Sequence, residues 1–318
     1  MKKSILTLIA LLIITVVTLA QEAAPAKVDT SAKADTAITD NKVPKDTSWT
    51  KGGNFGLNVA QSSFNNWQAG GENNISTTAL LSVFANKKKE NYTWDNTLDL
   101  AYGLLRQGNE GQVFKTDDKI DFSSKYGKKA VKKWYYSALI NFKSQFSEGV
   151  ENPTAAVKKR ISDFMAPAYL IVAIGMDYKH NKYFSVFISP LTSKTTFVLD
   201  QTFANAGAYG VEAATYDPAT GLLLTEGENV LYQMGAYLKA EYKKDIMENV
   251  NLGTKLDLFS NYLEKPENID ISWELLLAMK VNKYITSSIS THLIYDHDQI
   301  TETQFKEVIA VGFSYKFN

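Results

Sequence analysis

The residues of this chain that could do chemistry are two groups of carboxylates, one of which contains a histidine. Asp296, His297 and Asp298 are consecutive in the sequence. Asp117 and Asp118 form a second acidic pair. A carboxylate that orients an imidazole beside a second acidic pair can activate water as a general base, and the same oxygens could hold a divalent cation. Solvated loop tips are the third interpretation and the one we expect, so we predict no catalytic residue and no metal site.

Other signatures of catalysis or cofactor binding are missing from the sequence. It contains no cysteine, no Gly-Lys-Ser/Thr phosphate loop and no pair of histidines at metal-binding spacing. His180 and His292 stand in a predicted turn and a predicted strand, and we interpret them as structural. The 34 basic residues balance the 34 acidic ones, so no basic face indicates a nucleic-acid partner. We therefore predict that the chain is not an enzyme and binds no cofactor.

The N-terminal segment is excluded from the fold. Lys2 and Lys3 precede an apolar run that ends with small residues, which predicts a signal peptide over residues 1–20, cleaved near Ala20. An uncleaved N-terminal anchor is the alternative. Residues 21–48 have almost no large apolar side chain, which predicts a disordered periplasmic leader. No later run of about 18 apolar residues exists, so a helical membrane protein is excluded.

The stretch NYTWDNTLDLAYGL, residues 91–104, alternates between two faces. One face is apolar except for Asn96, and the other carries Asp95, Asp99 and small polar residues. This period of two predicts a β-strand, either of a soluble sandwich or of a barrel with lipid outside and water inside.

Segments of this kind recur twelve times, at roughly 53–62, 74–85, 92–104, 119–126, 134–146, 167–178, 183–191, 230–242, 250–260, 269–281, 284–296 and 305–317. Longer links follow the odd segments, including RQGNEGQVFKTDD and HDQITETQ, and short lysine-bearing turns follow the even ones. A sandwich has no physical reason for this order, whereas an outer-membrane barrel has short periplasmic turns and long outer loops. We predict an all-β fold, a single transmembrane antiparallel up-and-down β-barrel of about 12 strands over residues 49–318.

The two faces of the predicted strands assign residues to the lumen and to the lipid. A hydrated lumen is expected, because burying so many unpaired charges would cost several kcal/mol each. The candidate lumen-lining residues are Asp95, Asp99, Asp121, Lys125, Lys143, Lys239, Lys255, Asp257, Glu274 and Lys280. The candidate aromatic residues at the lipid interfaces are Tyr92, Trp94, Tyr102, Trp134, Phe142, Tyr232, Tyr242, Phe313, Tyr315 and Phe317.

The C-terminal sequence VIAVGFSYKFN places an aromatic residue at the penultimate position. It resembles the last strand of Gram-negative outer-membrane barrels, which normally ends in an aromatic residue that the barrel assembly machinery recognises. The stretches SFNNWQAGGENN, WDNTLDLAYGLLRQGN and ISPLTSKTTFV resemble an uncharacterised outer-membrane β-barrel family of the Bacteroidetes, domain of unknown function 3078. The resemblance covers about residues 49–318 and implies a fold but no activity.

These observations lead to two expectations for function. The first is a narrow channel or transporter for small solutes in the outer membrane of a Gram-negative bacterium, since twelve strands lie between filled small barrels and wide porins. The alternative is a membrane-anchored structural or interaction protein that presents extracellular loops, with a surface hydrolase as a distant third. The expected partners are outer-membrane lipid and the barrel assembly machinery. The stretch between Leu191 and Val230 is expected to fold over or into the mouth, or to extend the strands.

Overall fold

The computed structural model describes residues 48–64, 68, 72–108, 111–151 and 159–317. The expected signal peptide and nearly all of the expected leader lie outside these residues. None of the described helices is long and apolar enough to cross a membrane.

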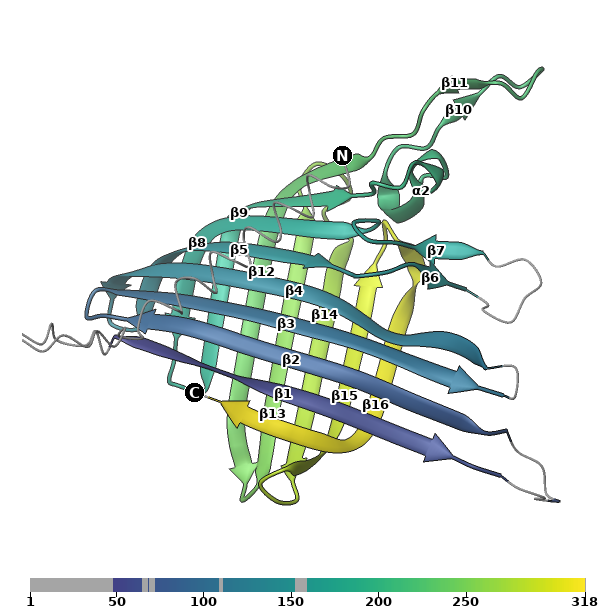
Figure 1. Ribbon diagram of the computed structural model, residues 1–318. Helices are drawn as coiled ribbons and strands as arrows, with labels where there is room; N and C mark the ends of the chain where they lie inside the picture. Colours follow the sequence, from purple (N-terminus) through teal and green to yellow (C-terminus); the bar gives the residue numbers. More distant parts are fainter. Residues whose placement is uncertain (1–47, 65–67, 69–71, 109–110, 152–158, 318) are drawn as a thin grey trace, which may run out of the picture. The chain divides into compact units, whose positions relative to one another are not determined.

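Twelve antiparallel strands close into a barrel, which confirms the predicted fold class (Figure 1). Each strand pairs with the strands that precede and follow it, because an apolar and a polar face alternate along each one and fix its register. In order around the barrel the strands are β1 (Trp49–Ser62), β2 (Asn74–Lys88), β3 (Tyr92–Gln107), β4 (Gln112–Val131), β5 (Trp134–Ser144), β8 (Ala168–Lys179), β9 (Phe184–Phe197), β12 (Val230–Met247), β13 (Val250–Asn261), β14 (Ile269–Lys280), β15 (Ile285–Asp296) and β16 (Ile300–Phe317).

The strands are longer than predicted, and the prediction of long loops after β3 and β15 is wrong. β3 and β4 continue as a hairpin to the pair Gln107–Gln112, and β15 and β16 continue to the pair Asp296–Ile300. The polar sequences RQGNEGQVFKTDD and HDQITETQ therefore belong mainly to strands. Polar residues suggest a loop when read alone, but their backbone groups here are paired by the neighbouring strand.

The two ends of the barrel differ. At one end, here called the short-turn end, five turns lie between consecutive strands, at 89–91, 132–133, 180–183, 248–249 and 281–284. At the other, the loop end, the connections carry the hairpin β6 (Gly149–Val150) and β7 (Arg160–Ser162), the helix α2 (Gln201–Asn205), the 3-10 turn η1 (Ala208–Gly210), and the hairpin β10 (Thr215–Tyr216) and β11 (Leu223–Thr225). The short-turn end thus has short turns only, whereas the connections at the loop end range from residues 297–299 to the long segment 198–229.

The segment between β9 and β12 is partly packed and partly projecting. Phe203 and Ala204 of α2 are buried with Val198 and Ala166 at the loop end, whereas β10 and β11 extend away from the barrel (Figure 1). Arg160 Nη2 donates to Asp200 Oδ2 at 2.8 Å and so ties β7 to the start of α2. Partial burial opposes ionisation of Asp200, but its hydrogen bonds from Arg160 and Thr202 hold its pKa below the ordinary value. This contact is therefore kept at neutral pH and lost as pH falls through the lowered pKa.

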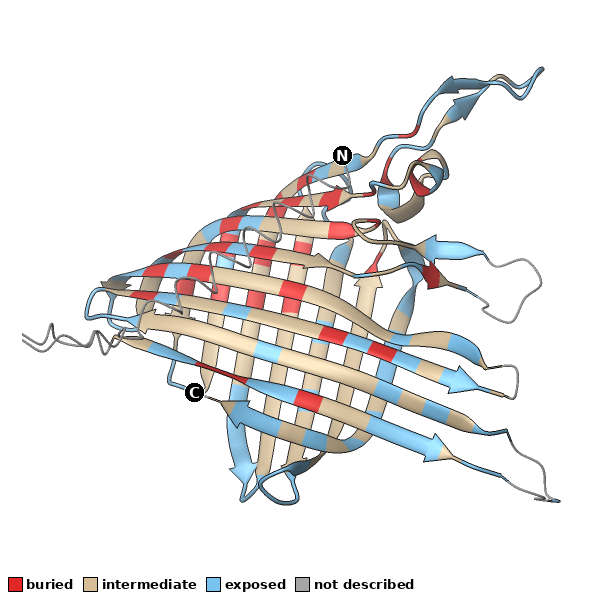
Figure 2. Cartoon of the chain, in the orientation of Figure 1, coloured by how far each residue is buried: buried red, intermediate tan, exposed pale blue. Residues whose placement is uncertain are grey.

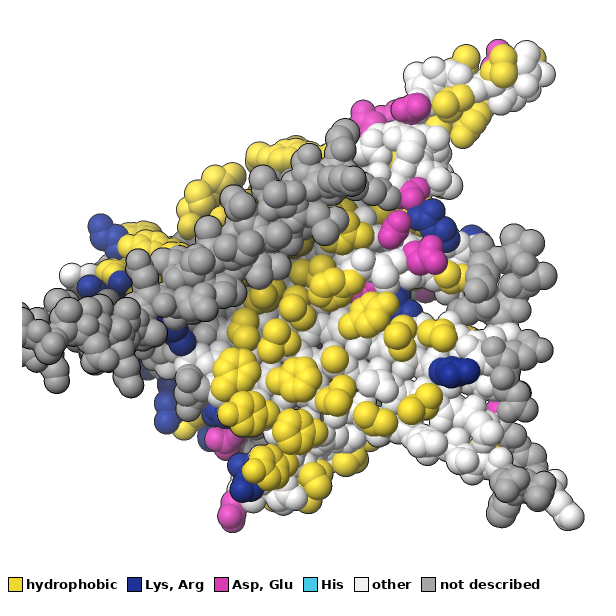
Figure 3. Space-filling model, viewed as in Figure 1, with side chains coloured by type: hydrophobic (Ala, Val, Ile, Leu, Met, Phe, Trp, Pro, Cys, Tyr) yellow, Lys and Arg dark blue, Asp and Glu magenta, His cyan; other side chains and the backbone are white. Residues whose placement is uncertain are grey.

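The outer wall of the barrel is apolar (Figure 3). Ile309 is 68% exposed, and Ile140 and Ile174 are also exposed. Figure 2 shows that the strands are mostly half-buried or exposed, with buried residues concentrated on part of the wall. A single closed sheet must expose one face to its surroundings along its whole length.

Aromatic side chains of neighbouring strands meet on the outer face. Tyr92 and Tyr126 stack with ring centroids 5.7 Å apart. Of the ten aromatic residues expected at an interface, Trp94, Tyr102, Tyr232, Phe313 and Tyr315 are exposed and the others are half-buried, namely Tyr92, Trp134, Phe142, Tyr242 and Phe317.

Asn96, the polar residue on the otherwise apolar face of β3, has hydrogen-bond partners on neighbouring strands. Trp94 Nε1 donates to Ser124 Oγ at 3.0 Å, and this hydroxyl donates to Asn96 Oδ1 at 2.8 Å. The amide of Asn96 in turn donates to the carbonyl of Ala85 at 2.8 Å. No solvent is needed to satisfy these groups, so an apolar environment around this face is tolerable.

A charge on the outer face of β3 should damage folding far more than a change on its inner face. We expect Leu98→Arg to cost about 2 to 4 kcal/mol in the free energy of unfolding, because it places a guanidinium on the apolar wall. Asp99→Asn should be nearly neutral, since its Oδ1 can still accept the hydrogen bond from Ser82 Oγ, 2.5 Å long in the native protein. A urea titration of both variants refolded into bilayers measures the difference. Equal costs would contradict the assignment of the two faces.

Candidate functional site in the barrel lumen

Ion pairs cross the interior of the barrel. Lys119 Nζ on β4 lies 2.9 Å from Glu274 Oε2 on β14. Five strands separate β4 from β14 in either direction around the barrel, so the two strands are opposite each other. This pair therefore spans the lumen.

Lys255 on β13 is the centre of the interior charge network. Its Nζ lies 3.2 Å from Asp121, 3.5 Å from Glu274 and 3.8 Å from Asp257. Lys143 on β5 approaches Asp257 at 3.7 Å. Three carboxylates thus converge on one ammonium group in a partly desolvated interior, where each partner depends on the others.

A smaller set of ion pairs lies toward the short-turn end. Lys125 on β4 pairs with Asp177 on β8 at 3.1 Å. Lys179 on β8 pairs with Asp95 on β3 at 2.7 Å. These contacts join strands that are not neighbours, which shows that the side chains point inward.

Apolar side chains fill the interior beside these charges. Leu139, Phe187, Tyr237 and Phe259 are all less than 5% exposed and form one cluster with Ala173. Tyr237 donates its hydroxyl to Asp257 at 2.5 Å and so joins the cluster to the charge network. The expectation of a hydrated lumen is therefore wrong for this half of the barrel, formed by β4, β5, β8, β9, β12 and β13. Mutual pairing removes the cost that led us to expect water there.

The structure places the ten expected lumen residues as follows. Seven belong to the ion pairs just described: Asp95, Asp121, Lys125, Lys143, Lys255, Asp257 and Glu274. Asp99 binds Ser82, Lys239 lies 3.3 Å from Glu241 on its own strand, and Lys280 is exposed at the end of β14.

Sequence reasoning missed several interior residues. Lys119 and Asp177 are essential members of the network, and Tyr237 and Phe187 belong to the interior cluster. Lys119 could have been found by extending the alternation of β4 backward from Asp121. Phe187 and Tyr237 could not, because large apolar residues at inward positions contradict the simple rule of polar inside and apolar outside.

The other half of the lumen is lined largely by small side chains, here called the small-residue wall. It consists of the small inward residues of β1, β2, β15 and β16: Asn54, Gly56, Asn58, Ala60, Ser76, Thr78, Ser82, Ser288, Ser290, Ala310 and Gly312. Larger inward residues interrupt the wall on the same strands, namely Leu80, Phe84, His292, Lys306 and Val308. Asn54 and Ala60 are exposed although they face inward, as is Thr97 on the adjacent strand β3. Space therefore remains along this wall beside the filled half.

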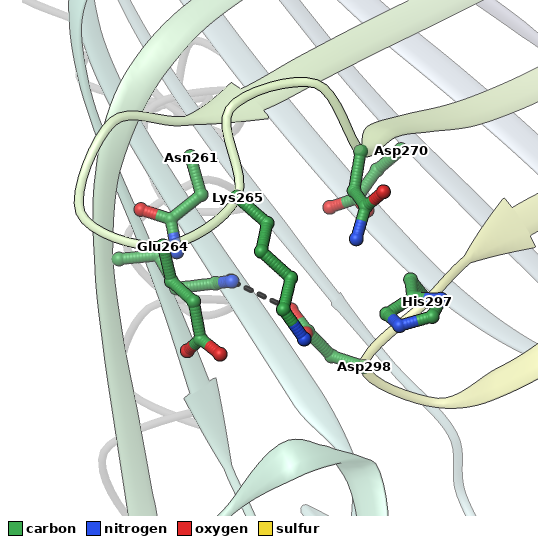
Figure 4. A pocket seen from close by; sticks show the side chains of 8 residues that line it. Asn261, Glu264, Lys265, Asp270, His297 and Asp298 are labelled. Carbon is green, nitrogen blue, oxygen red and sulfur yellow. Dashed lines mark hydrogen bonds between the residues drawn. The ribbon is translucent and has the colours of Figure 1, made fainter.

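A polar pocket lies at the loop end of the lumen (Figure 4). Its lining includes Gln233, Asp270, His297 and Asp298. Carboxylate oxygens of Asp270, Asp296 and Asp298 lie within 4.8 Å of one another. The pocket thus gathers two of the residues singled out in the sequence with an aspartate from β14.

Lysine and glutamine side chains already engage these carboxylates. Lys194 Nζ lies 2.6 Å from Asp270 and 3.0 Å from Asp296. Gln233 Nε2 donates to Asp298 at 2.7 Å (Figure 4). Since an ammonium group stands between two of the three carboxylates, we assign no metal to the cluster.

The second acidic pair of the sequence is engaged elsewhere. Asp118 accepts hydrogen bonds from Lys115 and from the backbone of Phe146 and Ser147. Asp117 accepts one from Lys306 at 2.8 Å. Asp117 and Asp118 are therefore paired with Lys306 and Lys115, whereas Asp296 is paired with Lys194. Among the described residues, the structure shows no hydrogen bond between the two acidic groups.

Part of the chain matches a known protein family. Residues 59–150 match the family described as a protein of unknown function (DUF3078). This match covers the end of β1 to the end of β6, a narrower range than the resemblance expected from the sequence. No curated protein matches the chain.

Several solved outer-membrane barrels are similar in structure. The translocator domain of the autotransporter NalP from Neisseria meningitidis has a TM-score of 0.39 and 9% identity, covering 84% of this chain and 87% of that one. An outer membrane channel from Pseudomonas putida F1 gives 0.35 and 10%, covering 84% and 95%. The NanC porin gives 0.33 and 9%, covering 84% and 97%. These values are too low to support an argument about function.

Removing the central lysine should destabilise the barrel. Lys255→Met leaves Asp121, Asp257 and Glu274 close together without their shared cation, and we expect a loss of about 3 kcal/mol in the free energy of unfolding. Lys280→Met removes an exposed lysine of the adjacent strand and should be nearly neutral. Urea unfolding followed by tryptophan fluorescence compares the two. A neutral Lys255→Met would show that water, rather than the lysine, stabilises the three carboxylates.

Proposed function

We propose that this chain is an outer-membrane β-barrel that forms a narrow passage for small polar solutes. The apolar outer wall with its aromatic residues supports contact with lipid, and the exposed polar residues Asn54 and Thr97 on the inner face support contact with water. An exported, membrane-spanning barrel of this kind places the short-turn end in the periplasm and the loop end outside the cell. Lipid of the outer membrane is then its principal surroundings.

The division of the lumen into two halves carries the proposal. Ion pairs and the cluster around Phe187 fill one half, while the small-residue wall leaves room along the other. One ion pair, between Lys306 and Asp117, crosses this second half toward the loop end. Serine, threonine and asparagine side chains on this wall offer hydrogen bonds without net charge. Because the interior charges are held in pairs, we expect weak selectivity between anions and cations.

The C-terminal strand supports a role for the barrel assembly machinery. β16 closes the barrel against β1, with Phe317 in register with Gly53. The ring of Phe317 lies over this glycine, where an added Cβ would approach within 2.5 Å. We propose that the machinery recognises this aromatic terminus before β1 and β16 pair.

A second candidate function rests on the hairpin β10–β11. Tyr216, Leu222 and Leu224 are more than 50% exposed at its surface, and the hairpin projects from the loop end (Figure 1). Exposed apolar side chains grouped on a protruding element are typical of a contact surface. The barrel would then serve as an anchor that presents this hairpin to a surface partner.

Labelling of introduced cysteines tests the proposed orientation. The chain has no cysteine of its own, so each introduced thiol is unique. Ala219→Cys, at the exposed tip between β10 and β11, should react with a membrane-impermeant maleimide on intact cells. Lys88→Cys, at the short-turn end, should react only after permeabilisation. Reaction of Lys88→Cys on intact cells would contradict the orientation.

Conductance of the refolded barrel in planar bilayers tests the passage. The double variant Lys119→Ala, Glu274→Ala removes a pair that spans the lumen and should raise single-channel conductance above that of the native barrel, because it widens the open half. The matched control Glu151→Ala, Lys159→Ala removes a lysine–glutamate pair from a loop, 2.8 Å long and exposed, and should leave conductance unchanged. If neither the native barrel nor the first variant conducts, the passage is absent and the anchor function is favoured.

A further inference from the structure

The barrel closes where β1 meets β16, and this junction is here called the seam. The two strands pair over only part of its length. β1 and β16 pair at six positions, from Gly53–Phe317 to Asn58–Gly312. β1 pairs with β2 along its whole length, Trp49–Ser62, and β16 pairs with β15 as far as Ile300. Among the residues that the structure describes, 59–62 of β1 and 300–311 of β16 therefore pair with a strand on one side only. Figure 1 shows the two strands separating toward the loop end.

Unpaired strand edges are unexpected in a membrane barrel. Within hydrocarbon, each backbone N–H or C=O group without a partner costs several kcal/mol, and a closed barrel normally has no edge. The open edges lie beside the apolar wall, since Val59, Phe305, Ile309 and Val311 all face outward and are more than 50% exposed. The part of the opening next to the closed register, at Val59, Ile309 and Val311, is thus apolar on its outer side, whereas Glu307 faces outward farther toward the loop end.

The inward-facing residues next to the closed register are small or apolar and carry no charge. Ala60 and Ala310 would be the next inward pair if the register continued, and Val308 follows on β16. All three positions border the small-residue wall. The gap therefore connects the open half of the lumen with the surroundings of the barrel at these three positions. Lys306, the next inward residue of β16, pairs with Asp117 and bounds the gap toward the loop end.

At the last closed position the two strands approach each other closely. Gly312 faces Asn58, and a Cβ added to this glycine would lie 2.0 Å from Asn58 Oδ1 and 2.5 Å from the carbonyl of Leu57. β1 and β16 approach this closely only because position 312 has no side chain. Beyond it, alanine and valine side chains stand at the corresponding positions of both strands, and the pairing ends.

We propose that the opening between β1 and β16 is a lateral portal for the hydrocarbon chain of a membrane amphiphile. The chain passes between the lumen and the loop-side leaflet along Ala60, Val308 and Ala310. The unpaired backbone groups of both strands bind the polar head of the amphiphile, which supplies the partners that the missing ladder does not. This inference rests on the proposed location in a membrane but does not require conduction through the whole barrel.

Disulfide formation tests whether the seam is open. The pair Leu57→Cys, Phe313→Cys lies within the closed register and should form a disulfide readily, since facing residues of an antiparallel ladder have suitable Cα separations. The pair Val59→Cys, Val311→Cys is the next position on the same outward face and should form little or none. The native chain has no cysteine to interfere. Equal yields from the two pairs would show a closed seam and overturn the portal.

A fluorescence experiment tests whether acyl chains enter. A bimane label is attached to a cysteine at Ala60, at Thr97 or at Val172, in vesicles whose phospholipids carry a spin label on the acyl chain. Val172 is 42% exposed on the outer face and reports contact with lipid. Thr97 faces inward away from the seam and serves as the matched lumen control.

Quenching at Val172 and Ala60, with none at Thr97, is the expected result. Quenching at Val172 alone, or at all three sites, would overturn the portal while leaving the membrane barrel intact. Absence of quenching at Val172 would overturn the proposed membrane location itself. The failure of the two proposals is thus distinguishable.

Discussion

A ring of antiparallel backbone hydrogen bonds is the constraint on which this structure depends. Because successive side chains point to opposite faces, closure of the ring forces one face of every strand inward and the other outward. Leu98 and Asp99 are adjacent in the chain, yet one joins the outer wall and the other the lumen. The same ring gathers distant residues, such as Lys119 and Glu274, into contact across the interior.

The interior shows that charged residues can pack a lumen rather than hydrate it. Lys255 stabilises three carboxylates at once, and Tyr237 links that network to an apolar cluster. The cost of removing these charges from water is offset by pairing and hydrogen bonding, provided that every member is present. As a result, space is confined to the wall where the side chains are small, so the position of any passage is set by side-chain volume more than by strand number.

The seam between β1 and β16 is the exception to the closed ring. Everywhere else the ladder continues well toward both strand ends, but here it stops at Asn58 and Gly312. The opening adjoins the small-residue wall, so the least filled part of the lumen lies beside the least paired part of the wall. These two features together link the interior to the apolar surroundings without a change in the fold. A glycine at the last closed position allows the close approach of the two strands there.

The sequence by itself determined the strands, their faces and the difference between the two ends of the barrel. These follow from local rules, since a period of two and a short turn are visible in a few consecutive residues, as in residues 91–104. It did not reveal that polar residues after β3 and β15 extend strands, because a neighbouring strand supplies the partners. Only the tertiary structure decided which charges meet, that Phe187 points inward, and where the seam opens. Each of these depends on strand register and on residues far apart in the chain, such as Lys194 and Asp296, which no local pattern relates.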